Sequence, residues 1–136
     1  MEITVSTQQG TVPVTVVQPH GDVDASNYAE LVSKIESLQK DGAKDFILDL
    51  SDVPFMSSAG LVALHSIANM LRGEKPTDMQ TGWAALKSID RSREAGLQKH
   101  VKLLNPQQYV AETFEKAGFT QFFEVFTDVK TAVAAF

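Results

Sequence analysis

The stretch Phe46–Leu61 limits the folds open to this chain more than any other part of the sequence. It opens with the nearly continuous apolar run Phe46–Leu50, which is typical of a strand buried on both faces in the centre of an α/β sheet. Pro54 cannot donate to a sheet ladder, so a loop must follow this strand. After the loop, apolar residues recur at helical spacing, namely Leu61, Leu64, Ala68 and Leu71. The stretch therefore predicts a buried strand, a short loop and an apolar helix.

Two serines stand where this helix must begin. Either Ser57 or Ser58 suits the N-cap, because a serine hydroxyl can accept from a backbone N–H of the first turn. A hydroxyl beside the small residues Ala59 and Gly60 is also reachable by another protein, which makes Ser58 a candidate phosphorylation site. A phosphate there would carry about −1.5 to −2 charges at the positive end of the helix dipole, so the helix should tolerate it. An apolar or acidic partner surface packed over the turn would not tolerate the phosphate, because the added charge would have to be desolvated or would be repelled. The site would therefore act as a binding switch.

Several segments of the chain resemble the STAS domain family, which includes bacterial anti-sigma factor antagonists and the cytoplasmic tails of sulfate transporters. The segment from Asp49 to Leu61 resembles the family signature. Gly21–Asn27 resembles the family's first turn from strand to helix. Leu103–Pro106 and Phe114–Phe119 resemble its last strand and the helix that follows. The resemblance extends over most of the chain.

This resemblance implies an α/β fold, with a STAS-like mixed sheet of about four to five strands and about four helices. The length of 136 residues predicts a single domain over residues 1–136. Within it, the resemblance identifies an insertion at about 73–99, a segment that ordinary STAS domains replace with a short turn. In the antagonists, the residue that matches Ser58 is phosphorylated by a partner anti-sigma kinase. Many phosphorylated members carry Asp immediately before this position, whereas this chain has Ser57, which is therefore a second candidate.

The resemblance also implies partners. The unphosphorylated chain would bind an anti-sigma factor with serine kinase activity, and a separate phosphatase would reset Ser58. The kinase holds the ATP, so we expect no cofactor in this chain. The alternative is a non-switching STAS subunit of a stable complex, such as a stressosome-like complex or a lipid-transport ATPase complex, in which the serine only caps. Self-association into a homo-oligomer stays open. The residues expected to bind the partner are Asp22, Asp24, Ser26, Asn27, Met56, Ser57, Ser58, Ala59, Gly60 and Leu61.

The order of the elements predicts which loops meet. An N-terminal hairpin should precede a helix that is capped by Ser26 or Asn27 and ends before Gly42, and the strand Asp45–Leu50 follows. A strand, a helix and a strand in that order imply a parallel pair, with the turn around Asp22 and Asp24 at the same edge as the two serines. The two turns can then form one surface with an acidic rim.

The C-terminal part predicts further elements of the same type. We expect a buried strand at Val101–Leu104, then a helix capped by Asn105 that ends at Gly118. An edge strand at 122–126 and a last helix capped by Thr127 or Asp128 should follow. The insertion carries Trp83, which is either pinned on the domain within a surface excursion or a contact for a partner or a second copy.

Composition excludes several classes of function. A net charge of −5 argues against binding to a nucleic acid backbone, which needs a basic surface. The absence of cysteine excludes disulfides, thiolate metal sites and cysteine nucleophiles. No apolar run approaches the roughly 18 residues of a membrane span, and Glu2 stands where a signal peptide needs positive charge. We therefore expect a cytoplasmic protein without membrane insertion.

An enzymatic function finds little support in the sequence. The nearest nucleophile and base are Ser58 and His65, but seven residues along a helix correspond to about 10.5 Å of rise. His65 should instead be a surface or partly buried helix residue. His20 and His100 are too scattered to form a metal site with Asp22. We predict no catalytic residue and no metal site.

Overall fold

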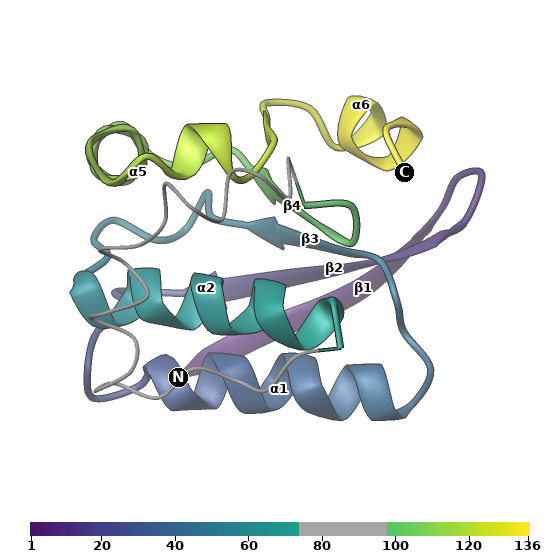
Figure 1. Cartoon of the computed structure of the whole chain (residues 1–136), viewed down its shortest axis with the longest axis horizontal. Helices are drawn as coiled ribbons and strands as arrows, with labels where there is room; N and C mark the ends of the chain where they lie inside the picture. The colour runs from purple at the N-terminus through teal and green to yellow at the C-terminus, as the bar shows by residue number, and fades with distance from the viewer. Residues whose placement is uncertain (74–97) are drawn as a thin grey trace.

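A computed structural model describes residues 1–73 and 98–136. In these two ranges, five strands form one sheet in the order β1-β2-β3-β4-β5, flanked by helices (Figure 1). The elements are β1 Glu2–Gln9, β2 Pro13–His20, α1 Tyr28–Lys40, β3 Phe46–Asp49, α2 Ser58–Leu71, β4 Val101–Leu104, α5 Gln108–Ala117, the 3-10 helix η2 Phe119–Gln121, β5 Val125–Phe126 and α6 Val129–Ala134. The predicted α/β fold with a mixed sheet is confirmed.

The sheet combines one antiparallel pair with three parallel pairs. β1 and β2 form the predicted hairpin, with Gln9 opposite Pro13. β2, β3, β4 and β5 are parallel neighbours. The carboxyl ends of β2, β3 and β4 therefore lie at one edge, and the loops that follow them meet there, as the strand-helix-strand order predicted.

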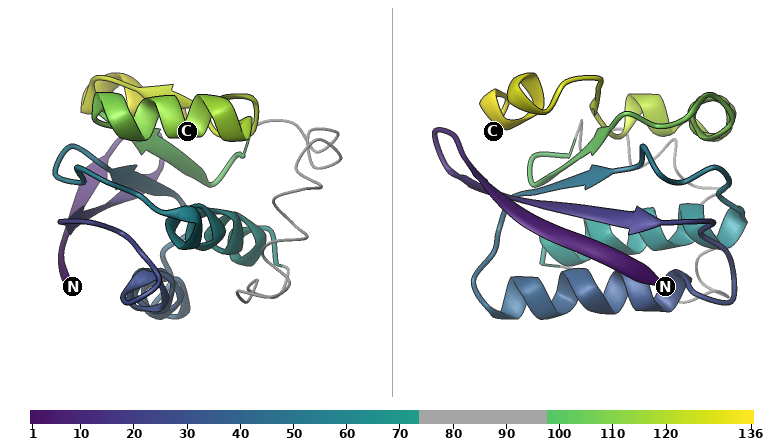
Figure 2. Two further views of the ribbon diagram at one scale, coloured as in Figure 1. Left: turned by 90° about the vertical axis from the view of Figure 1, so that its left-hand side faces the viewer. Right: turned by 180° about the vertical axis from the view of Figure 1, so that it is seen from behind.

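The two faces of the sheet bury different side chains. On one face, Val17, Phe46 and Leu48 pack in the larger core with residues of α1, α2 and α5. On the other face, Ile47 packs in a smaller cluster with Val133 of α6. Figure 2 shows α1 and α2 next to each other on one side of the sheet and α6 on the other. Because the strand residues of both clusters are apolar, β3 reads as a continuous hydrophobic run in the sequence.

Helix α2 is buried almost all round, which explains its nearly uniform apolar sequence. His65 is only 6% exposed, and its ring stacks on Phe122 with 6.0 Å between the centroids. The expectation of a surface or partly buried position for His65 was therefore wrong. The helix period could not reveal this, since Phe122 reaches α2 from the distant C-terminal part of the chain.

The start of α5 differs from the prediction. The helix begins at Gln108, so Asn105 does not cap it and Pro106 lies outside it. Asn105 has a positive φ of 49°, and its N–H donates to the carbonyl of Phe126 at 2.8 Å. This bond continues the pairing of β4 with β5 by one residue, so the chain cannot turn into the helix at that point. Gly118 ends α5 in the left-handed conformation, with φ of 79°, as predicted.

The predicted edge strand at 122–126 is shorter than expected. Only Val125 and Phe126 form β5. Phe122 and Phe123 are fully buried, and their rings pack edge to face at 5.0 Å. Both rings enter the core, so these two residues do not alternate between faces as a strand requires. Asp128 caps α6 as predicted, accepting from the N–H of Thr131 at 2.9 Å.

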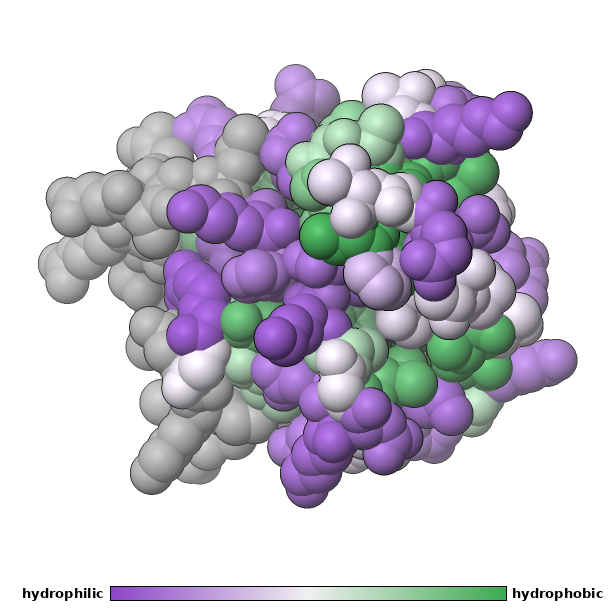
Figure 3. Space-filling model, turned by 90° about the vertical axis from the view of Figure 1, so that its right-hand side faces the viewer, coloured by the Kyte–Doolittle hydropathy of each residue, from purple (hydrophilic) through white to green (hydrophobic). Residues whose placement is uncertain are grey.

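The end of the molecule where the β1–β2 hairpin turns and α6 lies is a mosaic of small hydrophobic and hydrophilic patches (Figure 3). Val12, Val129 and Phe136 are partly buried there against the smaller cluster. Within the described ranges, no helix is both long enough and apolar enough to cross a membrane. The predictions for Trp83, and for most of the insertion at 73–99, lie outside the described residues.

Candidate functional site

The turn after β2 and the loop after β3 are joined by backbone hydrogen bonds. The N–H of Val23 donates to the carbonyl of Phe55 at 3.1 Å, and the N–H of Ser57 donates to the carbonyl of Val23 at 2.9 Å. Val23 and Met56 form an isolated parallel bridge. The N–H of Gly21 also donates to the carbonyl of Asp52 at 2.9 Å. The prediction that these two turns form one surface is confirmed at the level of the backbone.

The two serines have different roles at the start of α2. Ser57 is the N-cap, in an extended conformation, and its Oγ accepts from the N–H of Ala59 at 3.2 Å. Ser58 is the first residue of the helix and is half-buried. Within residues 1–73 and 98–136, its hydroxyl has no hydrogen-bond partner. Capping therefore occupies the hydroxyl of Ser57 and leaves that of Ser58 available for chemistry.

The residues on either side of the two serines are buried. Met56, Ala59 and Gly60 are buried, and so is Leu61. A Cβ added to Gly60 would lie 2.3 Å from Cγ of Met56 and 3.2 Å from Cγ1 of Val23. These four residues, which were expected from the sequence to bind the partner, are therefore buried in the protein and support the loop.

The turn between β2 and α1 is held by its own side chains. Asn27 occupies the N-cap position of α1, as one alternative predicted, but its side chain makes no capping bond. Instead, its Oδ1 accepts from the N–H of Asp24 at 3.0 Å, and its Nδ2 donates to the carbonyl of Asp22 at 2.9 Å. The side chain of Asn27 therefore braces the turn that precedes the helix.

Ser26 in the same turn stabilises the ionised form of Asp24. The Oγ of Ser26 donates to the Asp24 carboxylate at 2.5 Å, and the N–H of Ser26 donates to it at 2.9 Å. These two bonds hold the pKa of Asp24 below its ordinary value, because they stabilise the ionised form. Asp22 is exposed and Asp24 is half-buried. The turn thus presents negative charge beside the loop that carries Ser57 and Ser58.

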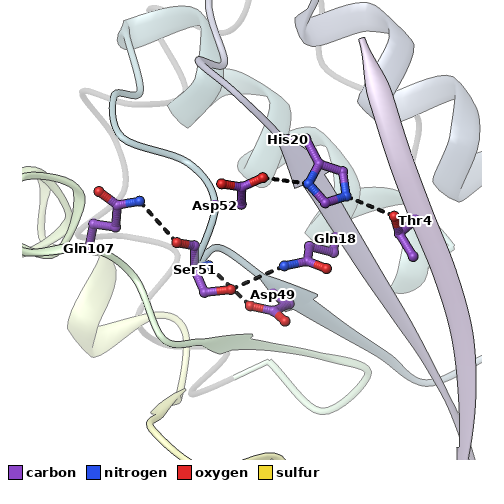
Figure 4. Close-up of polar contacts among 7 residues, drawn as sticks. All are labelled: Thr4, Gln18, His20, Asp49, Ser51, Asp52 and Gln107. Atoms are coloured by element: carbon purple, nitrogen blue, oxygen red, sulfur yellow. Dashed lines mark hydrogen bonds and ion pairs between the residues drawn. The ribbon is translucent and has the colours of Figure 1, made fainter.

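Polar contacts tie the start of this loop to β1 and β2 (Figure 4). Nδ1 of His20 lies 2.5 Å from Oδ2 of Asp52, and its Nε2 lies 2.7 Å from Oγ1 of Thr4. His20 was considered only as a metal ligand in the sequence, and its actual neighbours are a loop carboxylate and a strand hydroxyl. These contacts connect the loop to both strands of the hairpin, a neighbourhood that no local pattern predicts.

Ser51 connects the loop to its other neighbours (Figure 4). Nε2 of Gln18 donates to Oγ of Ser51 at 3.1 Å, and the N–H of Ser51 donates to Oδ1 of Asp49 at 3.0 Å. Gln107 Nε2 donates to its carbonyl at 2.9 Å, from the connection between β4 and α5. The loop is therefore held from both sides before it reaches the serines.

An exposed aromatic pair beside the loop was not predicted. Phe55 is 38% exposed and Tyr109 of α5 is 54% exposed, and their ring centroids are 5.6 Å apart. A groove of about 390 Å³ adjoins Tyr109, lined by Leu61 of α2 and by Tyr109, Glu112, Thr113, Lys116 and Ala117 of α5. The sequence could have indicated that Tyr109 is exposed, because Tyr109 falls outside the apolar stripe of its helix. It could not have indicated that Tyr109 lies next to Phe55.

Comparisons with known proteins identify similar sequences and folds. The model of the STAS domain family matches residues 2–75. No curated protein matches the chain. An anti-sigma factor antagonist from Mycobacterium paratuberculosis is 18% identical, with a TM-score of 0.63 over 97% of this chain and 94% of that one.

The antagonist SpoIIAA is also similar. Its unphosphorylated form is 16% identical, with a TM-score of 0.56 over 95% of this chain and 93% of that one. Its phosphorylated form, from Bacillus, is 16% identical, with a TM-score of 0.50 over 95% of this chain and 96% of that one. At these identities, the likeness concerns the fold.

Proposed function

The chain belongs to the STAS domain family, and from that premise we propose that it is a regulatory protein of the anti-sigma factor antagonist kind. In the unphosphorylated state it binds a partner switch kinase through the surface formed by the turn Asp22–Asn27 and the loop Ser51–Ser57. Phosphorylation of Ser58 by that kinase releases it, and a phosphatase resets it. The protein acts in the cytoplasm by binding rather than by catalysis.

The observation that supports this proposal most strongly is that Ser57 caps α2 with its hydroxyl, whereas Ser58 does not. Ser57 caps α2 with its Oγ. Ser58 lies at the first helical position and is half-buried. A phosphate on Ser58 would leave the cap intact and would lie at the positive end of the helix dipole, where no acidic residue occupies the first turn. The Oγ of Ser57 is already engaged in the cap, whereas the hydroxyl of Ser58 has no hydrogen-bond partner among the described residues, so we favour Ser58 over Ser57 as the modified residue.

Charge supports a switch at this position. Asp24 is held in its ionised form by its bonds to Ser26, which lower its pKa, and Asp22 and Asp52 are exposed nearby in the two joined turns. A phosphate would add about −1.5 to −2 charges to this acidic surface. A partner packed over the turn would have to desolvate that charge or withdraw. Binding would therefore be lost while the fold persists.

The experiment that tests the proposal is to incubate the protein with ATP and a lysate of its host, and to map phosphate by mass spectrometry. We expect one phosphate on Ser58 in the wild-type chain and in the Ser57→Ala variant, and none in Ser58→Ala. Phosphate that maps to Ser57, or none at all under conditions that saturate the kinase, would contradict the proposed switch. If no phosphate were found, the chain would instead be a non-switching subunit of a stable complex.

The exposed aromatic pair should anchor the partner. We expect Phe55→Ala and Tyr109→Ala each to weaken binding of the unphosphorylated chain by about tenfold, near 1.4 kcal/mol, since exposed aromatic side chains supply much of the energy of interfaces. Titration calorimetry with the purified partner measures this. Val125→Ala is the matched control, because Val125 is 39% exposed but lies on the edge strand β5. If Phe55→Ala and Tyr109→Ala both bound the partner as tightly as Val125→Ala and the wild type, the aromatic pair would not be part of the interface.

A further inference from the structure

The edge strand β1 directs a row of backbone groups away from the sheet. The N–H of Thr15 in β2 donates to the carbonyl of Asp45, next to β3, at 2.9 Å. Because backbone groups alternate in direction along a strand, the odd-numbered residues of β2 face β3 and the even-numbered ones face β1. The register pairs Val16 with Ser6 and Gln18 with Thr4. The even-numbered residues of β1 therefore bond to β2, and the odd-numbered ones, Ile3, Val5, Thr7 and Gln9, face outward.

This outer edge lacks most of the features by which proteins usually protect an edge strand. Within residues 1–73 and 98–136, β1 has a strand neighbour only on its β2 side. The strand Glu2–Gln9 contains neither proline nor lysine, and its register with β2 is continuous, without a bulge. All its residues except Ile3 are exposed. A long, regular strand of this kind is a template for pairing with another strand.

The side chains of β1 favour a second copy as that strand. In an antiparallel pair centred on Thr4, Ile3 of one copy lies opposite Val5 of the other, and both outward-facing residues exchange backbone bonds. Ile3 is half-buried and Val5 is 36% exposed, so the pairing would cover both side chains. The single charged side chain of β1 is that of Glu2, which would lie opposite Ser6 of the second copy. No like charges meet across the strands.

A groove lies between the start of this edge strand and α1. It measures about 470 Å³ and is lined by Met1 and Ile3 at the start of β1 and by Glu30, Ser33, Lys34 and Ser37 on α1. The apolar side chains of an added strand would lie next to Ile3 at this groove. Glu30 and Lys34 supply both signs of charge at its rim.

We propose that two copies of this chain associate through antiparallel pairing of their β1 strands, with the two-fold axis at Thr4, to form one continuous sheet. Such an interface is self-complementary, because the same residues donate and accept on both copies. The inference rests on the backbone and the side chains of β1 and does not depend on phosphorylation of Ser58.

Cysteine cross-linking tests the register. The chain contains no cysteine, so a single Thr4→Cys substitution can form a disulfide only between copies. Thr4 would form a non-hydrogen-bonded pair with its counterpart, at a Cα distance of about 4.5 Å, which a disulfide can span. Ser6→Cys is the matched control on the same face, with the two Cα atoms about 14 Å apart. In a glutathione buffer, we expect the Thr4→Cys dimer to form several-fold faster.

A proline variant tests the pairing itself. Val5→Pro removes an outward N–H and leaves the bonds between β1 and β2 in place, whereas Val5→Thr keeps that N–H. By sedimentation over a concentration series, we expect the wild type and Val5→Thr to dimerise and Val5→Pro to stay monomeric, with similar circular dichroism spectra. A monomeric wild type, or equal cross-linking of the two cysteine variants, would overturn the proposal. A monomeric wild type would leave the edge to a strand of another protein.

Discussion

Ser58→Asp is expected to abolish capture of the partner kinase, with a loss of affinity of about 100-fold or more, which corresponds to about 2.7 kcal/mol. The carboxylate would place a permanent negative charge on the half-buried first residue of α2, beside the acidic turn at Asp22 and Asp24. A partner surface packed there would have to desolvate this charge. Titration calorimetry with the unphosphorylated chain and its variants gives the affinities.

The matched control for charge is Ser58→Asn, which is nearly the same size as Asp and neutral. We expect Ser58→Asn to keep most of the affinity, and Ser58→Ala to bind like the wild type without being released by ATP. The melting temperature of Ser58→Asp should not fall, because an acidic residue in the first turn of a helix interacts favourably with the dipole. Should Asp and Asn at this position weaken binding equally, size rather than charge would be responsible, and the switch mechanism would be wrong.

Gly60→Ala is expected to lower the free energy of unfolding by about 1–3 kcal/mol, although alanine is the better helix former. The new methyl group would lie 2.3 Å from Cγ of Met56 and 3.2 Å from Cγ1 of Val23. Cγ is close to the main chain, and Met56 is itself buried, so the loop must move to relieve the clash. Urea unfolding followed by circular dichroism measures the change.

The same substitution should also weaken partner capture, because Met56 and Val23 form the bridge that joins the two turns. A double mutant tests the cause. Met56→Ala alone removes buried volume and is destabilising, but it also removes the atom that the new methyl group meets. We expect the effects of Gly60→Ala and Met56→Ala to be less than additive when combined. Strict additivity would show that the two side chains do not clash, and that the cost of Gly60→Ala has another origin.

The parts of the site that follow from local pattern could be predicted. Three features depend on a few consecutive residues: the loop that contains Pro54, the start of α2 at the two serines and the position of Asn27 before α1. The meeting of the two turns followed from the order of strand, helix and strand. The bonds of the Asn27 side chain could not be predicted, because a capping bond and a bracing bond to the preceding turn use the same atoms and differ only in backbone conformation.

The sequence by itself determined the class of the fold, the strand and helix that lead into the candidate site, and the resemblance that singles out Ser58. Apolar periodicity and turn residues are local properties, so they can be read without coordinates. Only the tertiary structure brought Phe55 next to Tyr109 and His20 next to Asp52, moved the start of α5 away from Asn105, and buried Met56 of the loop. These arrangements depend on contacts between residues that are far apart in the chain. The number of residues between two such positions does not determine their distance in the folded protein.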